Sequence, residues 1–460
     1  MVRPDPSLGS KYDAVFDHAT LKKPEAVSAP PTKRPLLSLL NVSLTVVIVA
    51  VLAVWLRPGW LPPPQETAVV TNPFQNVFDW VLKNGAEIGN INVIGFDGYY
   101  ELVASKHIEE GERLLTVPIS QILDENMILA DDIVQSVSEL TDSLDESGAA
   151  VVFLLANQDK WGVYLDMIQQ LDVPSPMFWS EDDIELLKSS MINNMIGELT
   201  SILSEQYATI EQFFTGLTFE EYSRLWVNVN SRMWQLQKSE TESINALMPV
   251  FDFATHSTEA NVEIGYEPEL DAVVMTSTVE LNPSESLHNF YYNTSNIHHL
   301  LFQGFTIEEN DDHLACEIEL GESRCPVDSN MRTSVSDTLV KCVKALDDGS
   351  TVKDLWVKVS EFATAALSEF PNTLSEDDAL LQTELAPVLH NAVQARRSEK
   401  ICLNQVKSFS DLMTAAVTTN SWDGVDVAVA ESQDAKDYVE SLKADQRSLN
   451  REPNKLVNKI

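Results

Sequence analysis

Three runs of sequence decide the fold of this chain: LWVNVNSRMW (225–234), PVFDFATHSTEANVEI (249–264) and NPSESLHNFYYNTSNIHHLLFQGF (282–305). They place a dense set of polar residues on hydrophobic, strand-like runs: Ser231, Arg232, Asp252, His256, Tyr291, Ser295 and Asn296. A few polar side chains on apolar elements are a common construction of a small-molecule site. We therefore interpret the stretch from Leu225 to Phe305 as the functional centre of the chain.

Around this stretch the hydrophobic pattern alternates between strands and helices. Residues 87–118 have β-branched and aromatic runs broken by Phe-Asp-Gly and Glu-Glu-Gly turns, which predicts strands. Residues 124–231 place apolar side chains three and four positions apart, which predicts helices, and strands return over 262–291. From Thr338 onward the spacing is helical again, and the last forty or so residues are polar enough to predict a frayed helix or disorder. We expect the two strand blocks to share one sheet region, with the helical insert looped out between them.

Two shorter helix signals stand out. FQNVFDWVLKN (74–84) predicts a short helix with Gly85 in the C-terminal capping position. Ser180 precedes an acidic turn and is expected to cap a helix N-terminus, with Asp183 three residues on.

Length and charge restrict the function classes. The chain has 460 residues, 44% of them hydrophobic, a formal net charge of -39 and a pI of about 4.4. This length is too great for one ordinary core, so we expect two or three domains. A surface this acidic repels phosphate backbones, which argues against nucleic-acid binding and favours a basic protein segment as partner. A generic solubilising surface explains the acidity equally well.

The four cysteines give no metal motif. None of them forms a Cys-x-x-Cys pair, so the sequence does not support a zinc cluster, and we predict no metal site. Cys316 and Cys325 flank a short run and are the pair that we expect to be able to bridge, because Cys342 and Cys402 lie far apart in the sequence. The redox state of the compartment stays open.

One segment predicts a membrane anchor. Pro35 to Leu56 contains no charged residue and is long enough to cross a bilayer as a helix. Several basic residues precede it and only Arg57 follows closely, so the positive-inside rule predicts a cytosolic N-terminus. A buried helix of a globular domain and a cleaved signal peptide are the alternatives. We therefore expect a single-pass membrane protein whose compartment the sequence does not identify.

Four segments together resemble the SET-domain protein methyltransferases, in the subgroup of the Rubisco large-subunit methyltransferase and the actin-histidine methyltransferase. ELVASKHIEEGERLLTVP (101–118) resembles the first SET block, and WGVYLDMIQQLDVPSPMFWSEDDIELLKSS (161–190) resembles the helical insert of the subgroup. The runs between 225 and 305 resemble the Ser-Arg, Asp-x-x-Asn-His and Tyr-Gly-x-x-Ser-Asn series of the family. FPNTLSEDDALL (370–381), followed by ARRSEK (395–400), resembles the helical substrate-binding domain that ends the subgroup.

This resemblance implies an α+β fold: a SET-type β fold with a helical insert, then an all-helical C-terminal substrate-binding domain. The uncharged run 35–56 adds a predicted N-terminal transmembrane helix. The expected domains are an N-terminal tail (1–34), a transmembrane helix (35–56), a Pro-rich linker (57–73), a SET domain (74–310) with its insert at about 125–230, a helical Rubisco-methyltransferase-like domain (311–415) and a polar tail (416–460).

The resemblance also implies an S-adenosylmethionine-dependent protein N-methyltransferase, with lysine favoured over histidine as acceptor. In such a reaction the cofactor carries the reactive methyl group, while the protein supplies position and electrostatics. Tyr291 falls on the family's catalytic tyrosine, a phenol that orients the amine, and Tyr292 takes that place if the loop is one residue shorter. From spacing alone, the favoured interpretation of either residue is a core aromatic with its hydroxyl bonded to a carbonyl.

The remaining site residues follow from the same motifs. The implied cofactor-binding residues are Glu101, Leu102, Arg232, Asp252, Thr255, His256 and Tyr291, and the implied substrate-binding residues are Tyr292, Gln303 and Phe305. Arg232 would pair with the cofactor's carboxylate. A structural ion pair is the alternative for Arg232, and a satisfied structural imidazole is the alternative for His256. Ser295 and Asn296 match the family's Ser-Asn, and Asn296 is expected to hold its loop in place.

The chain departs from the family pattern at four positions. Thr255 stands where the family has Asn and lacks the two donors of a carboxamide. Glu101 stands where the family has a glycine that lets the backbone approach the cofactor. Tyr292 replaces another glycine, and Gln303 replaces an aromatic residue. These departures support a second hypothesis, a catalytically degenerate SET-fold protein that acts as a membrane-anchored peptide-binding module.

Overall fold

The computed structural model describes residues 72–96, 99–320, 323–329, 337–345, 350–430 and 432–451. The chain divides after Thr71, and the segment 35–56, predicted to span a membrane, lies outside the described residues, as does nearly all of the predicted linker. Across the described ranges, no helix combines the length and the apolar character that crossing a bilayer requires. The prediction of a single-pass membrane protein with a cytosolic N-terminus is therefore corrected, since no described helix supports it.

The central sheet joins strands from both halves of the chain. Its order is β1 (Glu87–Ile88), β4 (Arg113–Pro118), β10 (Ala272–Ser277), β9 (Val262–Glu267), and all neighbours are antiparallel. In the β4–β10 pair, Val117 lies opposite Val273 and Leu115 opposite Met275, and all four side chains are buried. These cross-strand apolar pairs fix the register of the sheet. The prediction that the two strand blocks share one sheet is confirmed.

Besides the C-terminal hairpin, the described residues form three smaller sheets. They are the antiparallel pair β2 (Ile91–Phe96) and β3 (Tyr99–Ala104), the three strands β5 (Leu123–Asp124), β7 (Ser243–Leu247) and β6 (Met233–Gln237), and the parallel pair β8 (Thr255–His256) and β11 (His288–Asn289). The β8–β11 pair lays two distant segments side by side, with Thr255 opposite His288 and His256 opposite Asn289.

Helices form before and between the strand blocks where the apolar spacing predicts them. Helix α3 (Pro73–Lys83) begins at Asn72, whose side chain accepts from the Phe74 amide, and Gly85 follows the helix with a φ of +102°. The insert consists of α4 (Glu125–Leu129), α5 (Asp132–Ser138), α6 (Glu146–Ala156), α7 (Gln158–Gln169), α8 (Glu181–Ile184), α9 (Met191–Ile210) and α10 (Phe219–Asn230). Short 3-10 turns lie at η2 (Ile119–Gln121), η3 (Pro176–Phe178), η4 (Glu185–Leu187) and η5 (Phe251–Phe253). Ser180 caps α8 by accepting from the Asp183 amide, as predicted.

The C-terminal region is mostly helical but contains a β-hairpin. After α11 (Asn296–Gln303), the elements are β12 (Leu314–Leu320), β13 (Ser323–Ser329), α12 (Asp337–Ala345), α13 (Val352–Glu369), α14 (Leu374–Leu381), α15 (Pro387–Thr419), α16 (Asp423–Ala428) and α17 (Gln433–Arg451). The expectation of an all-helical domain is wrong at the hairpin, because Leu314, Cys316 and Ile318 alternate along β12 and are buried together. Where the sequence predicts a frayed helix or disorder, α17 buries Tyr438 and Val439 in the same core as the hairpin.

The cysteine pairing also differs from the prediction. Cys316 is bonded to Cys402 and Cys325 to Cys342, with Cα–Cα distances of 5.7 and 5.9 Å. On the hairpin, Cys316 lies opposite Val327, and Cys325 lies opposite Ile318. The two hairpin cysteines are thus diagonal neighbours, and such pairs lie about 7–8 Å apart, beyond the usual disulfide span. Packing of α15 and α12 against the hairpin brings the real partners close.

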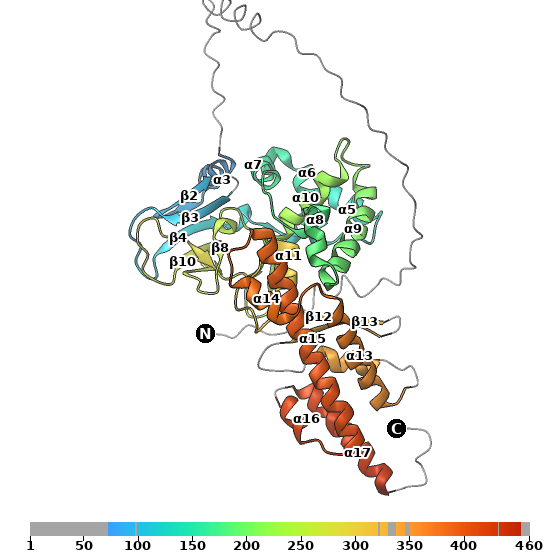
Figure 1. The fold of residues 1–460 in the computed structure, drawn as a ribbon. Helices are drawn as coiled ribbons and strands as arrows, with labels where there is room; N and C mark the ends of the chain where they lie inside the picture. Colours follow the sequence, from blue (N-terminus) through green and yellow to red (C-terminus); the bar gives the residue numbers. More distant parts are fainter. Residues whose placement is uncertain are drawn as a thin grey trace, which may run out of the picture. The chain divides into compact units, whose positions relative to one another are not determined.

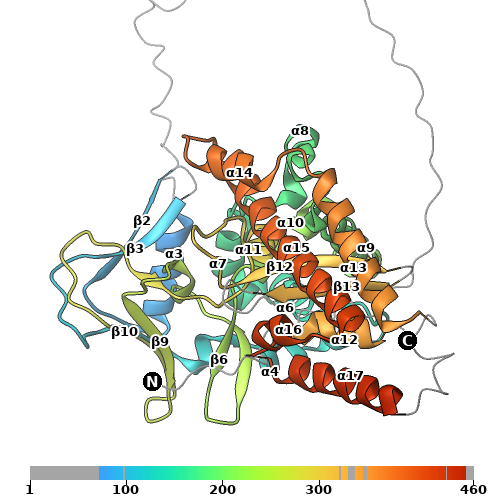
Figure 2. The same cartoon turned by 60° about the horizontal axis from the view of Figure 1, so that its bottom comes forward.

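Helix α15 is the long helix against which α11, α13, α14 and the β12 strand pack. Figures 1 and 2 show it with α11 and α14 beside its first half, and with α13 packed along it. Figure 1 also shows the strands β2, β3, β4 and β10 grouped on the side of the fold opposite the insert helices α5, α6 and α9.

Candidate active site

Tyr291 lies in the loop after β11 and is held at both ends of the residue. Its backbone amide donates to His256 Nδ1 at 3.2 Å, and its hydroxyl donates to the Ala254 carbonyl at 2.9 Å. The ring packs edge-on against Trp234, with centroids 4.9 Å apart, and against His256 at 5.1 Å. The β8–β11 pairing makes these contacts, because it fixes the 254–256 segment beside the chain that leads to Tyr291.

The protonation of Tyr291 follows from its burial. Burial raises the pKa of Tyr291 to about 12, with Arg232 opposing the shift and Asp252 adding to it. The phenol is therefore neutral at physiological pH and is no base. Its oxygen donates one hydrogen bond and keeps lone pairs that can accept another from an amine.

Arg232 and Asp252 form a buried pair next to this loop. Helix α10 ends at Asn230, just before Arg232, and Asp252 lies in η5. Arg232 Nη1 donates to the Asp252 carbonyl at 2.7 Å and lies 3.4 Å from its carboxylate Oδ2. Tyr164 of α7 donates its hydroxyl hydrogen to the same Oδ2 at 2.8 Å. The Arg232 guanidinium also lies over the Tyr100 ring, 5.1 Å from the centroid. Burial raises the pKa of Asp252, while the Arg232 charge and the Tyr164 hydroxyl act against that shift.

One donor and one acceptor of this pair remain unused. Within the described ranges, Arg232 Nε and Asp252 Oδ1 are buried and have no hydrogen-bond partner. Buried polar groups are rarely left unpaired, so this donor and this acceptor are candidates for contact with a bound molecule. The methionine end of S-adenosylmethionine carries a carboxylate that accepts and an ammonium that donates. An unused donor beside an unused acceptor fits that head group.

The predicted substrate-binding residues gather around two imidazoles. The Phe305 ring stacks on His256 at 5.6 Å and on His299 at 5.2 Å, and Tyr292 stacks on His299 at 5.6 Å. Gln303 Oε1 lies 2.6 Å from His299 Nδ1. Burial lowers the pKa of His256 and lowers that of His299 to about 4, so both rings are neutral at physiological pH.

The residues of the first SET block join the site only in part. Leu102 is fully buried, and its carbonyl accepts from the Leu287 amide at 2.8 Å, which ties β3 to the chain that enters β11. Thr255 shares a hydrogen bond of 2.8 Å with His288 Nδ1, so its hydroxyl is paired across β8 and β11. In the described part of the chain, no hydrogen bond or ion pair joins Glu101 to the Arg232 cluster, and it is the preceding Tyr100 that contacts Arg232.

Four residues of the site escape the sequence analysis: Tyr100, Tyr164, Trp234 and His299. Trp234 is two positions beyond Arg232 in the first run. An aromatic residue on the strand that follows Ser-Arg could therefore have identified Trp234 as a site residue. His299 stacks on Tyr292 and Phe305. Tyr164 reaches Asp252 from 88 residues away, and no local pattern announces that contact.

No protein-family model matches the chain. Among curated proteins, N-lysine methyltransferase setd6 of Xenopus laevis is 26% identical over 264 residues, which are 51% of this chain and 57% of the relative. Actin-histidine N-methyltransferase of Xenopus tropicalis is 22% identical over 276 residues, 55% of this chain and 46% of the relative. The matches thus span about half the length of these curated relatives.

Solved structures share the fold over most of this chain. Rubisco LSMT bound to AdoMet superposes with a TM-score of 0.61 and 18% identity, covering 81% of this chain and 100% of that one. The SET domain of LSMT bound to lysine and AdoHcy gives a TM-score of 0.61 and 18% identity, covering 80% and 98%. The chain therefore has the fold of the SET-domain methyltransferases, and its sequence relatives lie in the subgroup of the Rubisco large-subunit methyltransferase and the actin-histidine methyltransferase.

Proposed function

We propose that the chain is an S-adenosylmethionine-dependent protein N-methyltransferase that favours lysine as acceptor. The observation that carries the proposal is the buried phenol of Tyr291, fixed by Ala254 and His256, next to the Arg232–Asp252 pair with its unused donor and acceptor. The names of the curated relatives and the AdoMet, AdoHcy and lysine in the similar structures support the same reaction.

In this proposal Arg232 and Asp252 hold the cofactor. Arg232 Nε would donate to its carboxylate, and Asp252 Oδ1 would accept from its ammonium. When bound, the cofactor supplies an electrophilic methyl group. Thr255 and Leu102 contribute indirectly, since they keep β8, β11 and β3 aligned around that pair.

Tyr291 is the residue that we propose to orient the acceptor. Its oxygen would accept a hydrogen bond from the amine, which points the nitrogen lone pair at the methyl group. Trp234 and Phe305 would line the approach with apolar surface. Such surface disfavours a charged ammonium and so increases the neutral, reactive fraction of a lysine.

The substrate in this proposal is a basic protein segment. A chain with a formal net charge of -39 attracts such a segment at long range and steers its approach. The helices from α12 to α15 are proposed to contribute the surface that binds it, by analogy with the helical domain of the subgroup.

Calorimetric titration with S-adenosylmethionine tests the proposal. The wild-type chain should bind it, and Arg232→Met should weaken the affinity about tenfold to hundredfold, the usual loss for a charged hydrogen bond. Arg224→Met is the matched control, because Arg224 lies on α10, the helix that ends just before Arg232, and its ion pairs with Asp172 and Glu220 are exposed. Undetectable binding by the wild type at millimolar ligand would overturn the proposal and favour the non-enzymatic alternative.

A further inference from the structure

Helix α15 contains a segment whose buried side chains are mostly polar rather than apolar. Between residues 391 and 400 the sequence is NAVQARRSEK, and five of its polar side chains are at most 4% exposed: Gln394, Arg396, Ser398, Glu399 and Lys400. Buried polar groups persist only when they are hydrogen-bonded. Their partners therefore reveal what this segment holds in place.

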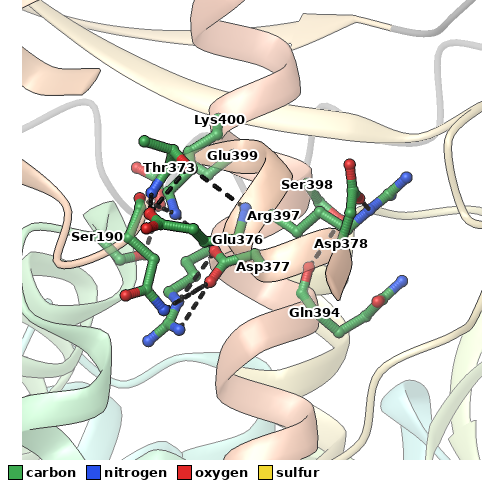
Figure 3. A network of polar contacts seen from close by, with 12 residues as sticks. Ser190, Thr373, Glu376, Asp377, Asp378, Gln394, Arg397, Ser398, Glu399 and Lys400 are labelled. Atoms are coloured by element: carbon green, nitrogen blue, oxygen red, sulfur yellow. Dashed lines mark hydrogen bonds and ion pairs between the residues drawn. The ribbon is translucent and has the colours of Figure 1, made fainter. Parts of the chain in front are cut away.

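One side of the segment is bound to α14 and to the start of α9. Arg396 and Lys400 both pair with Asp377, at 2.8 and 2.5 Å, and Glu399 accepts from the Met191 amide at 2.9 Å. Figure 3 shows Lys400 reaching Asp377, and Glu399 reaching Ser190 in the turn before α9. The contacts fix the position of α15 against the insert of the SET domain.

The other side of the segment faces the chain that follows Tyr291. Asn391, Gln394 and Ser398 are three and four positions apart, so they lie on one helix face. Their contacts are Thr306 Oγ1 donating to Asn391 Oδ1 at 2.9 Å, Gln394 Nε2 donating to the Ile307 carbonyl at 3.2 Å, and Asn296 Nδ2 donating to Ser398 Oγ at 3.2 Å. This face therefore holds both the start of α11 and the loop after it.

Asn296 is the centre of these contacts. It is fully buried, its Oδ1 accepts from the Ile307 amide at 2.8 Å, and its Nδ2 donates to the Ile307 carbonyl at 3.0 Å and to Ser398. Both hydrogens of the Asn296 carboxamide are thus committed. Ser295, its neighbour, caps α11 and ends the loop that begins after β11 and carries Tyr291.

We infer that Ser398 is a positioning residue for Tyr291 and acts through Asn296. The inference rests on the proposed function, because only there does Tyr291 orient an acceptor. Residues 290–295 lie outside helices and strands and connect β11 to Asn296. His256 and Ala254 bind Tyr291 within this loop, and the contacts of Asn296 fix its C-terminal end. Removing the Ser398 hydroxyl leaves a buried amide hydrogen of Asn296 without its acceptor, which loosens one end. A displacement of about 1 Å at a reacting group is enough to reduce a rate by about a hundredfold.

The test compares Ser398→Ala with Ser410→Ala. Ser410 is the matched control, because it is on the same helix, is fully buried, and donates to the carbonyl four residues back at 2.7 Å, as Ser398 does at 3.0 Å. Hydrogen exchange of the peptide covering 288–296 reports on the loop directly, and the Tyr291 amide is among its protons. Turnover of a basic lysine peptide reports on function.

Ser398→Ala should accelerate exchange in that peptide about tenfold and lower kcat about tenfold, with the KM for S-adenosylmethionine within about twofold of wild type. Ser398→Thr, which keeps the hydroxyl, should restore both, and Ser410→Ala should change neither. Unchanged exchange in Ser398→Ala, or an equal change in Ser410→Ala, would overturn the inference.

The positioning role of Ser398 and the proposed function are tested separately. If the loop exchanges faster in Ser398→Ala but the wild type shows no turnover, the positioning role is supported. The proposed function is then contradicted. If Ser398→Ala does not fold, Ser398→Cys keeps the side-chain volume and offers Asn296 only a weak acceptor, and unchanged loop exchange in that variant contradicts the inference.

Discussion

Replacing Asp377 by Asn should destabilise the chain severely, because this one carboxylate neutralises two buried cations. Asp377 is fully buried, and the Arg396 and Lys400 side chains that it pairs with are 4% and 1% exposed. Burial pushes the pKa of Asp377 up, but the hydrogen bonds from Arg396 and Lys400 outweigh burial and hold that pKa below its ordinary value. The carboxylate is therefore charged in the folded protein.

The magnitude follows from what the substitution leaves behind. Removing one partner of a buried ion pair costs about 3–5 kcal/mol, since the remaining charge keeps its desolvation penalty. For a unit of nearly four hundred residues, an unfolding entropy of about 2.1 cal/mol/K per residue converts about 4 kcal/mol into a Tm about 5 °C lower. Differential scanning calorimetry at neutral pH measures this difference.

Asp378→Asn is the matched control for this prediction. Asp378 is the next residue of α14 and pairs with Arg397 at 2.7 Å, but its side chain is 50% exposed. Exposed pairs contribute at most about 1 kcal/mol, so its Tm should fall by only about 1 °C. Equal Tm values for the two variants would refute the claim that α15 is held by buried charges.

Three further predictions use other parts of the fold. Burial raises the pKa of Glu399 to about 7 from 4.5, so the folded state keeps a proton that the unfolded state loses between these values. The free energy of unfolding should therefore fall as pH rises from about 4.5 to 7, by up to about 3 kcal/mol from this group. In urea titrations, Glu399→Gln should flatten this dependence on pH. An unchanged dependence would contradict the raised pKa of Glu399. Trp234→Ala should lower kcat/KM for a lysine peptide about tenfold and leave the cofactor affinity unchanged. Trp179→Ala, on the insert, should leave kcat/KM unchanged. A loss of cofactor affinity in Trp234→Ala would mean that this ring lies elsewhere in the site. Replacing both cysteines of the Cys316–Cys402 bridge by serine should lower stability by roughly 1 kcal/mol more than replacing those of the Cys325–Cys342 bridge. The reason is that the two bridges close loops of different length, with sequence separations of 86 and 17 residues. The reverse order of stability losses would contradict this prediction.

The parts of the fold that the sequence predicts are those with a local signal. Val117 and Val273 belong to runs whose β-branched pattern predicts strands, and they do face each other in the sheet. The capping of α8 by Ser180 is likewise a local effect of one side chain on the next turn. The order of the family-like motifs also allows one prediction about distant residues, namely that Arg232, Asp252 and Tyr291 lie near one another.

The parts that escape prediction depend on packing between distant segments. Cys402 becomes the partner of Cys316 only when α15 crosses the hairpin, and no spacing along the chain specifies that crossing. Tyr164 meets Asp252 for the same reason. The run ARRSEK resembles a family motif, yet its charges would ordinarily predict a solvated helix face. Asp377, on another helix, explains the burial of Arg396 and Lys400.

The most direct test of the central claim is methyl transfer from labelled S-adenosylmethionine to a library of basic peptides, measured for the wild type and for Tyr291→Phe. We predict that the wild type labels lysine-containing peptides, and that Tyr291→Phe loses most of the labelling while its calorimetric affinity for the cofactor stays within about twofold. Equal labelling by Tyr291→Phe, or no labelling by a wild type that binds the cofactor, would contradict the account.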